Sequence, residues 1–245
     1  MELDRLQDEH EAEVEEARGN GFTKVDPLSL SDRIYMQFRQ RLMRGELPPH
    51  FRIRTRDTAR ELGTSETPIR EAVFQLVRDG ALELKPRHYI RVRRLSLREY
   101  VELRDIRLKL EPMAAERALP QIDDAQVDEL ADIHARLIRA EDEAAYSDAI
   151  ELNQRFHFKI YRHSQMPALI DILESFWMRV GPLLNFQYPE GRPRYEGEHQ
   201  HLTILRALRG RDSTGLAEAV RNDLLEGGRD FLRHLEKLEQ ETGDQ

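Results

Sequence analysis

The sequence contains no cysteine in its 245 residues. This absence excludes disulfide bonds, thiolate-ligated metal sites and cysteine nucleophiles, and it is compatible with a reducing compartment. The sequence also has no apolar run of the roughly 18 to 20 residues that a bilayer-spanning helix needs. Its first 19 residues carry eight acidic residues and two arginines, unlike the basic and then apolar start of a signal peptide. We therefore expect a cytoplasmic protein without a membrane partner.

Charge is unevenly distributed along the chain. Residues 32–94 contain 15 Lys and Arg against 8 Asp and Glu, whereas the remainder contains 23 against 38. A basic segment attached to an acidic body is typical of a small nucleic-acid-binding head joined to a domain with another function. A chain in which 34% of residues are charged can also produce such a split by chance. The residue patterns must therefore distinguish a nucleic-acid-binding head from a chance distribution of charge.

The basic segment is predicted to begin with an amphipathic helix. Apolar residues recur at every fourth position from Ile34 to Leu42, and Ser29 or Ser31 can cap the helix start. Residues 1–27, which precede it, are predicted to form an acidic tail.

Two further helices and a hairpin are predicted to complete this head. A short helix has Thr55 as its N-cap and ends at Gly63, and another runs over residues 66–79. Apolar and polar residues then alternate over residues 82–92 on both sides of a turn at residues 85–88, which indicates a hairpin. Three helices and a hairpin predict a winged helix-turn-helix domain over residues 28–95.

The rest of the chain, residues 96–240, has no further strand alternation and is predicted to be an all-α helical bundle. The predicted fold class is therefore mainly α, with an N-terminal winged helix-turn-helix and a C-terminal bundle. Helices are expected near residues 96–118, 124–140, 143–163, 166–187, 195–209 and 213–238.

In a helix-turn-helix, the N-terminal residues of the second helix enter the major groove. The residues expected to face DNA are Ser65, Glu66, Thr67 and Arg70 on the second helix, Arg56 on the first helix, and Arg87 and His88 at the wing tip. Glu66 is unusual, because a carboxylate repels phosphate. It either stabilises the helix through the N-terminal dipole or accepts a hydrogen bond from a cytosine amino group.

Four residues of the bundle could hold a divalent metal. Asn153 and His157 are four residues apart and share one helix face, while His201 and Asp223 can meet them only if the chain reverses near residues 209–215. Two imidazoles, one carboxylate and one amide oxygen suit zinc, nickel or manganese. The alternative is that these histidines are hydrogen-bonded structural residues.

Two segments resemble a known family. The segment "RTRDTARELGTSETPIREAVFQLVRDGALELKPRHYIRVRRLS" resembles the winged-helix head of the GntR family of bacterial transcription regulators. The continuation "YVELRDIRLKLEPMAAERA" resembles the start of the FCD effector domain of the FadR branch. The resemblance covers about residues 28–235 and implies DNA contacts at Arg56, Ser65, Thr67, Arg70, Arg87 and His88.

The sequence departs from the family pattern at three positions of the head. Glu66 stands where the family usually has an arginine, His88 occupies the usual wing-glycine position, and Thr58 replaces a leucine. The departures put base reading at position 66 and the shape of the wing in question.

The resemblance also implies a metal in the bundle core, because members of this branch commonly use an Asp or Asn and three histidines. Asn153, His157 and His201 match this pattern, whereas Asp223 stands at the position of the last histidine. A carboxylate can replace an imidazole as a metal ligand.

One arginine of the bundle matches a family residue that points toward the ligand cavity. At that position Arg107 could bind the carboxylate of an effector beside the metal. The alternative is a simple pair with Glu111 along one helix face.

The sequence therefore predicts a ligand-responsive transcription regulator, not an enzyme. As a homodimer it would bind a palindromic operator, and a small carboxylate or sugar acid would release or retune it. Two alternatives remain open: a metal-dependent enzyme carrying a nucleic-acid-binding module, and a metal-free body that serves only for dimerisation.

Overall fold

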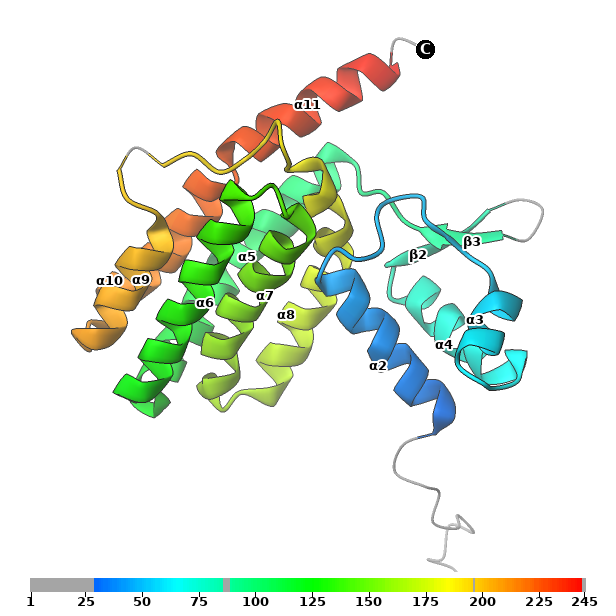
Figure 1. The fold of residues 1–245 in the computed structure, drawn as a ribbon, viewed down its shortest axis with the longest axis horizontal. Coiled ribbons are helices and arrows are strands. Elements are labelled where there is room, and N and C mark those ends of the chain that lie inside the picture. The colour runs from blue at the N-terminus through cyan, green and yellow to red at the C-terminus, as the bar shows by residue number, and fades with distance from the viewer. Residues whose placement is uncertain (1–28, 86–88, 196, 244–245) are drawn as a thin grey trace, which may run out of the picture.

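The computed structural model describes residues 29–85, 89–195 and 197–243, which form a small head and a larger helical body (Figure 1). The predicted tail, residues 1–27, and the predicted wing-tip residues Arg87 and His88 lie outside the described residues. The head lies at the right of Figure 1 and the body at the left, with helix α2 between them.

The head is a winged helix-turn-helix, as predicted. Its elements are α2 (Leu30–Met43), β1 (Arg52–Ile53), α3 (Thr55–Glu61), α4 (Glu66–Arg78), β2 (Leu82–Lys85) and β3 (Tyr89–Val92). The three strands form an antiparallel sheet in the order β1-β3-β2. The sequence missed β1, because two residues are too short to show an alternating pattern.

Helix α2 begins where its sequence predicts. Ser29 forms a capping box with Asp32, and the apolar stripe of Ile34, Phe38 and Leu42 is buried against the head core. Capping satisfies the first N–H groups of the helix, and burial of the stripe supplies the packing that a 14-residue helix needs.

The predicted N-cap of the next helix, Thr55, was wrong. Arg54 occupies the N-cap of α3 and makes no side-chain capping bond, while Thr55 is the first helical residue. Its hydroxyl donates instead to the carboxylate of Glu66, at 3.1 Å. Ser65 has the extended backbone of an N-cap, but its side chain makes no capping hydrogen bond.

The body is an all-α bundle, which confirms the predicted fold class. Its elements are α5 (Leu97–Ala118), η1 (Leu119–Gln121), α6 (Asp124–Asp142), α7 (Tyr146–Tyr161), η2 (Arg162–Ser164), α8 (Pro167–Val180), η3 (Gly181–Phe186), α9 (Gln200–Arg209), α10 (Ser213–Asn222), η4 (Asp223–Gly227) and α11 (Arg229–Gly243). No helix in the described part of the chain is long and apolar enough to cross a bilayer.

Three predicted helices of the body differ from the structure. The helix predicted over residues 166–187 changes to 3-10 geometry at Gly181, where Pro182 removes a backbone donor. The helix predicted over residues 195–209 begins only at Gln200, after its cap His199. The helix predicted over residues 213–238 is interrupted by the π-helical turn η4, which begins at Asp223.

The head is joined to the body by close packing between the end of α2 and η3. A Cβ atom added at Gly181 would lie 2.9 Å from the carbonyl oxygen of Met43 and would clash still more with that of Leu42. The amide of Asn185 donates to the carbonyl of Gly45 at 2.8 Å, and Arg39 of α2 pairs with Glu174 of α8. The two parts therefore touch backbone to backbone.

Replacing Gly181 with alanine should destabilise this junction, because backbone atoms cannot move aside as a flexible side chain can. We expect a loss of about 1–3 kcal/mol in the free energy of unfolding, measured by urea denaturation. The control is Gly197→Ala, since an added Cβ there meets nothing within 4 Å. Equal stability of the two variants would contradict the close approach.

Candidate functional site

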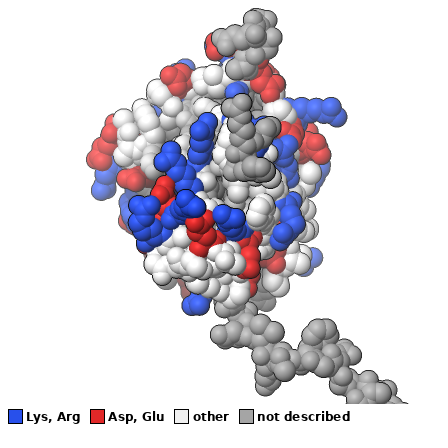
Figure 2. Space-filling view, turned by 90° about the vertical axis from the view of Figure 1, so that its right-hand side faces the viewer, with Lys and Arg blue, Asp and Glu red and all other residues white. Residues whose placement is uncertain are grey.

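The recognition helix α4 presents the predicted DNA-facing residues on the outside of the head. Ser65, Thr67, Arg70 and Arg56 are all exposed. Figure 2 looks at this side of the molecule and shows Lys and Arg side chains gathered across the middle of the face, with Asp and Glu side chains among them. The positive surface is therefore partly neutralised in the absence of a ligand.

Glu66 is a main source of this neutralisation, because it pairs with both of the predicted DNA-contacting arginines. Its Oε1 accepts from Nε of Arg56 at 3.0 Å and its Oε2 accepts from Nη2 of Arg70 at 3.2 Å. Partial burial would raise the pKa of the Glu66 carboxyl, but the hydrogen bonds from Arg70, Thr55 and Arg56 lower it below its usual value. Glu66 thus stays ionised and links α3 to α4.

The bundle brings together three of the four predicted metal ligands. Nε2 of His157 lies 3.1 Å from Oδ2 of Asp223 and 3.3 Å from Nε2 of His201, and the distance from His201 to Asp223 is 3.9 Å. Two ligands of a tetrahedral ion with bonds of about 2.0–2.1 Å lie about 3.3 Å apart. The donor set and its spacing therefore fit a divalent metal such as zinc.

The hydrogen bonds behind His157 favour the ring form that a metal needs. The Tyr161 hydroxyl donates its single proton to Oε2 of Glu111 at 2.8 Å, and its oxygen lies 3.2 Å from Nδ1 of His157. That oxygen can therefore only accept from Nδ1–H, which leaves the lone pair of the neutral ring on Nε2. A polar partner behind a ligating histidine orients it in this way.

Asp223 is positioned by the π-helical turn that it begins. Its Oδ1 accepts from the Tyr195 hydroxyl at 3.2 Å, and a Cβ at Gly227 would lie 2.8 Å from that hydroxyl oxygen. A side chain at position 227 would therefore have to displace the Tyr195 hydroxyl.

Asn153, the fourth predicted ligand, lines the same small cavity as His157 and Asp223. This cavity has a volume of about 70 Å³ and is bordered by Arg107, Tyr195 and both His157 and Asp223. A much larger open groove, of about 970 Å³, lies between α2 and α6–α7, and none of the predicted site residues lines it.

Arg107 satisfies both interpretations of its role. Its Nε donates to Oε1 of Glu111 at 2.6 Å, so the pair along the helix is formed, and both side chains are buried. The guanidinium also lies over the ring of Trp177, 4.6 Å from its centroid, and borders the 70 Å³ cavity. The pair with Glu111 thus holds the guanidinium at the edge of the cavity.

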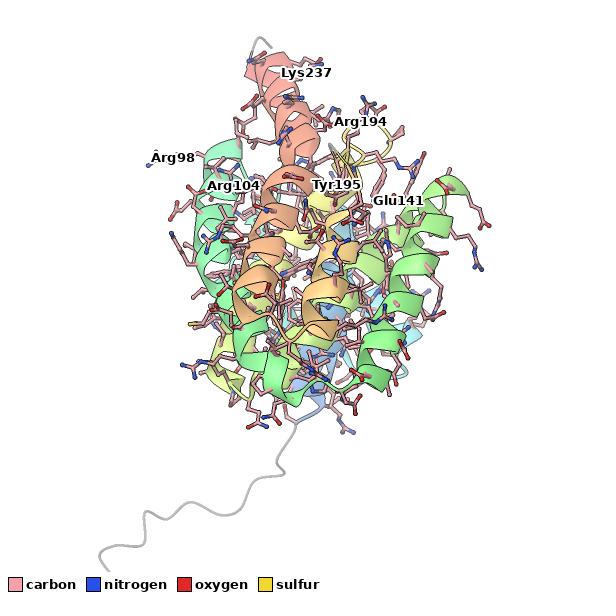
Figure 3. All side chains as sticks on the ribbon, turned by 90° about the vertical axis from the view of Figure 1, so that its left-hand side faces the viewer. Arg98, Arg104, Glu141, Arg194, Tyr195 and Lys237 are labelled. Atoms are coloured by element: carbon pink, nitrogen blue, oxygen red, sulfur yellow. The ribbon has the colours of Figure 1, made fainter. Side chains whose placement is uncertain are left out.

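Sequence reasoning missed four residues of this centre: His134, Tyr195, and Glu111 and Trp177 as a hydrogen-bonded pair. No spacing signal marks His134, Tyr195 or Trp177, and Glu111 was marked only as a partner of Arg107. His199 was not among the predicted ligands either. Figure 3 views the body from the side of α9 and α10, and Tyr195 and Glu141 lie toward the same end of the bundle.

A winged helix-turn-helix followed by an all-helical body is the architecture of one class of transcription regulators. The match to family models agrees: residues 30–92 match the bacterial regulatory proteins of the gntR family, and residues 102–226 match the FCD domain. The chain belongs to the GntR family and carries an FCD domain.

Individual relatives support the same assignment. The HTH-type transcriptional regulator McbR of Escherichia coli is 32% identical over 83% of this chain and 95% of its own length. The solved structure of E. coli McbR/YncC has a TM-score of 0.73 at 30% identity and covers 81% of this chain and 94% of that chain. The E. coli repressor RspR is 23% identical over 91% of this chain and 96% of its own length. The domains and the relatives are transcriptional regulators, not enzymes.

Replacing Glu66 with alanine should release Arg56 and Arg70. We expect tighter binding to DNA of any sequence and a salt dependence of log K steeper by about 1 to 2, because each newly engaged phosphate adds about 0.9 to the slope. The measurement is fluorescence anisotropy with DNA at several salt concentrations.

The matched control is Glu71→Ala on the same helix, because Glu71 is exposed and has no ion pair among the described residues. An equal effect of the two substitutions would show that Glu66 acts only as a charge. A change of preferred sequence in Glu66→Arg, rather than a uniform gain, would indicate base reading.

The metal-free protein should lose stability in mild acid. Burial lowers the pKa of His201 well below its usual value, so below about pH 6.5 the unfolded chain takes up a proton that the folded chain does not. His201 alone then costs up to about 1.4 kcal/mol per pH unit. Urea denaturation in a chelator, at pH 7.5 and 5.5, measures the change. His201→Asn should flatten the pH dependence, whereas His163→Gln should not.

Proposed function

We propose that this protein is a ligand-responsive DNA-binding regulator that binds a palindromic operator as a homodimer. The proposal assigns residues 28–95 to DNA binding and residues 96–240 to effector binding and dimerisation. A two-fold dimer presents two recognition helices, and this symmetry requires an operator with two related half-sites. Binding to chromosomal DNA also requires the cytoplasmic location that the sequence predicts.

The DNA contacts are proposed at Arg56, Ser65, Thr67 and Arg70, with Arg87 and His88 in the wing. Glu66 controls the two arginines of the helix pair. In the free protein it holds them, and in the complex phosphate or guanine competes for their donors. The ion pairs of Glu66 therefore affect both the non-specific affinity for phosphate and the specific affinity for a guanine edge.

The effector is proposed to be a small carboxylate or sugar acid held beside a divalent metal. The observation that carries this proposal is the approach of His157, His201 and Asp223 to within 3.1–3.9 Å, at a cavity bordered by Arg107. His157 and His201 would supply imidazole nitrogens, Asp223 a carboxylate oxygen and Asn153 an amide oxygen. A bound metal supplies a Lewis-acidic position for an anion, and Arg107 would bind the same anion from the other side.

The volume of the cavity limits the effector. About 70 Å³ accommodates only a few non-hydrogen atoms, so a carboxylate group fits, whereas the rest of a larger acid would have to displace Gln187, Pro193 or Tyr195. These residues lie on or next to the segment between η3 and α9. Movement of this segment would be transmitted through η3 to α2 of the head, because Asn185 and Gly181 contact α2 or the turn that follows it.

A gel-shift titration on DNA from upstream of its own gene tests the proposal. We expect a specific complex at moderate salt that is weakened or strengthened by small carboxylates when zinc is present. Arg107→Lys keeps the charge beside Glu111 but loses bidentate binding, so it should reduce the effect of the acid several-fold. The control is Arg104→Lys on the same helix.

The absence of a specific complex, with and without acids and zinc, would refute the regulatory function. A body that serves only for dimerisation is the second candidate. It predicts no bound metal by elemental analysis after zinc is added back, and no effect of small carboxylates on DNA binding, with or without zinc.

A further inference from the structure

A second group of imidazoles lies next to the first. His134 projects from α6, His199 caps α9, and His201 lies in the first turn of α9. Each offers a ring nitrogen, and these three atoms lie within 4.8 Å of one another. The ring centroids are 4.9 Å apart for His134 and His199, 5.4 Å for His134 and His201, and 4.5 Å for His199 and His201.

Two nitrogens of this group are buried and lack a hydrogen-bond partner within the described chain: Nδ1 of His134 and Nδ1 of His201. The two residues are 7% and 0% exposed. Buried polar atoms are nearly always paired, because an unpaired one loses its hydration without compensation. Two such atoms in one cluster therefore indicate a missing partner.

His201 has two nitrogens with different surroundings. Its Nε2 faces His157 and Asp223, at 3.3 and 3.9 Å. Its Nδ1 has no hydrogen-bond partner in that group. The ring of Phe156 stacks on the imidazole, with the ring centroids 3.8 Å apart. The ring therefore cannot turn freely to satisfy Nδ1, and the unpaired atom remains available to a second ligand.

His199 is fixed in place by the helix that it caps. Its Nδ1 accepts a hydrogen bond from the backbone N–H of His201 at 3.1 Å. In the neutral ring the proton is then on Nε2. A neutral imidazole has one lone pair, so a metal either takes Nδ1 itself or binds Nε2 after the proton has moved to Nδ1. In both cases metal binding at His199 replaces the capping bond by a metal–nitrogen bond.

We propose that His134, His199 and His201 form a second divalent-metal site, which shares His201 with the first group and binds zinc or a similar borderline cation through three imidazole nitrogens. Three imidazoles with a fourth position left open are a donor set that suits zinc. The site does not rest on the proposed function, since two of its residues lie outside the first group.

Because both sites use His201, only one of them can be occupied at a time. A neutral imidazole has a single lone pair, so His201 ligates one ion at a time. Each protomer then holds one ion, either between His157, His201 and Asp223 or between His134, His199 and His201.

The test removes the exclusive ligands of the first site. Untagged His157→Gln/Asp223→Asn protein is dialysed against Co²⁺, and bound metal is measured by elemental analysis and by visible absorption. We expect one equivalent of Co²⁺ in wild type and in this double variant, with a changed spectrum in the variant. Adding His134→Gln to the double variant should abolish binding, whereas adding His163→Gln should not.

Loss of all metal from the folded double variant, or an unchanged equivalent after the further His134→Gln substitution, would overturn the second site. The first result would still leave the first site standing, because wild-type binding is measured separately. If circular dichroism shows that the double variant does not fold, the single variant Asp223→Asn, which lacks the carboxylate of the first site, replaces it, and its histidine side-chain nitrogens are followed by NMR. Added zinc should then shift the His134 signals, identified by their loss in His134→Gln, and unshifted signals would refute the proposal.

Discussion

The centre of the body depends on one buried carboxylate, Glu111. It accepts hydrogen bonds from Arg107 of its own helix α5, from Tyr161 of α7 and from Trp177 of α8. A buried carboxylate is tolerated only when its oxygens are paired in this way. Removing it would leave a guanidinium, a phenol and an indole without their acceptor, all inside the bundle. The arrangement of three helices and the orientation of the site therefore depend on the same side chain.

The effect of Glu111 reaches the candidate metal ligands through Tyr161. Because the Tyr161 proton is committed to Glu111, its oxygen accepts from His157 and leaves Nε2 of that ring to face Asp223 and His201. The position of Arg107 has the same origin, since its guanidinium is held between Glu111 and the ring of Trp177. A purely structural ion pair and a ligand-binding arginine are thus compatible in one residue.

Much of the architecture could be predicted from the sequence, because it is encoded locally. The stripe of Ile34, Phe38 and Leu42, the cap at Ser29 and the hairpin alternation are patterns within a few residues, and the structure confirms them. Features that depend on distant contacts could not be predicted. Asp223, which begins the π-helical turn, accepts a hydrogen bond from Tyr195, 28 residues away, and no local sequence pattern indicates such a contact.

The residues of the candidate sites likewise divide into those that a local pattern marks and those that only distant contacts bring to the site. His157 and His201 could be selected because a helix face and a family motif mark them, whereas His134 carries no signal and joins the centre only through the packing of α6 against α9. Glu66 stood out as a charge of the wrong sign, but its partners Arg56 and Arg70 became known only with the side-chain positions. The sequence alone therefore identified Glu66 as unusual, but it could not show that Arg56 and Arg70 are its ion-pair partners.

The π-helical turn has one more consequence. A π turn contains about one residue more than an α turn, so the chain leaving it is rotated by about 100° relative to a continuous helix. After the turn, Phe231 and Leu235 of α11 pack with Leu95 and Tyr100, where the connection from the head enters the body. The residue that begins the turn is Asp223. The π-helical turn thus lies between a residue of the candidate metal site and the apolar contacts of α11 at the base of the head.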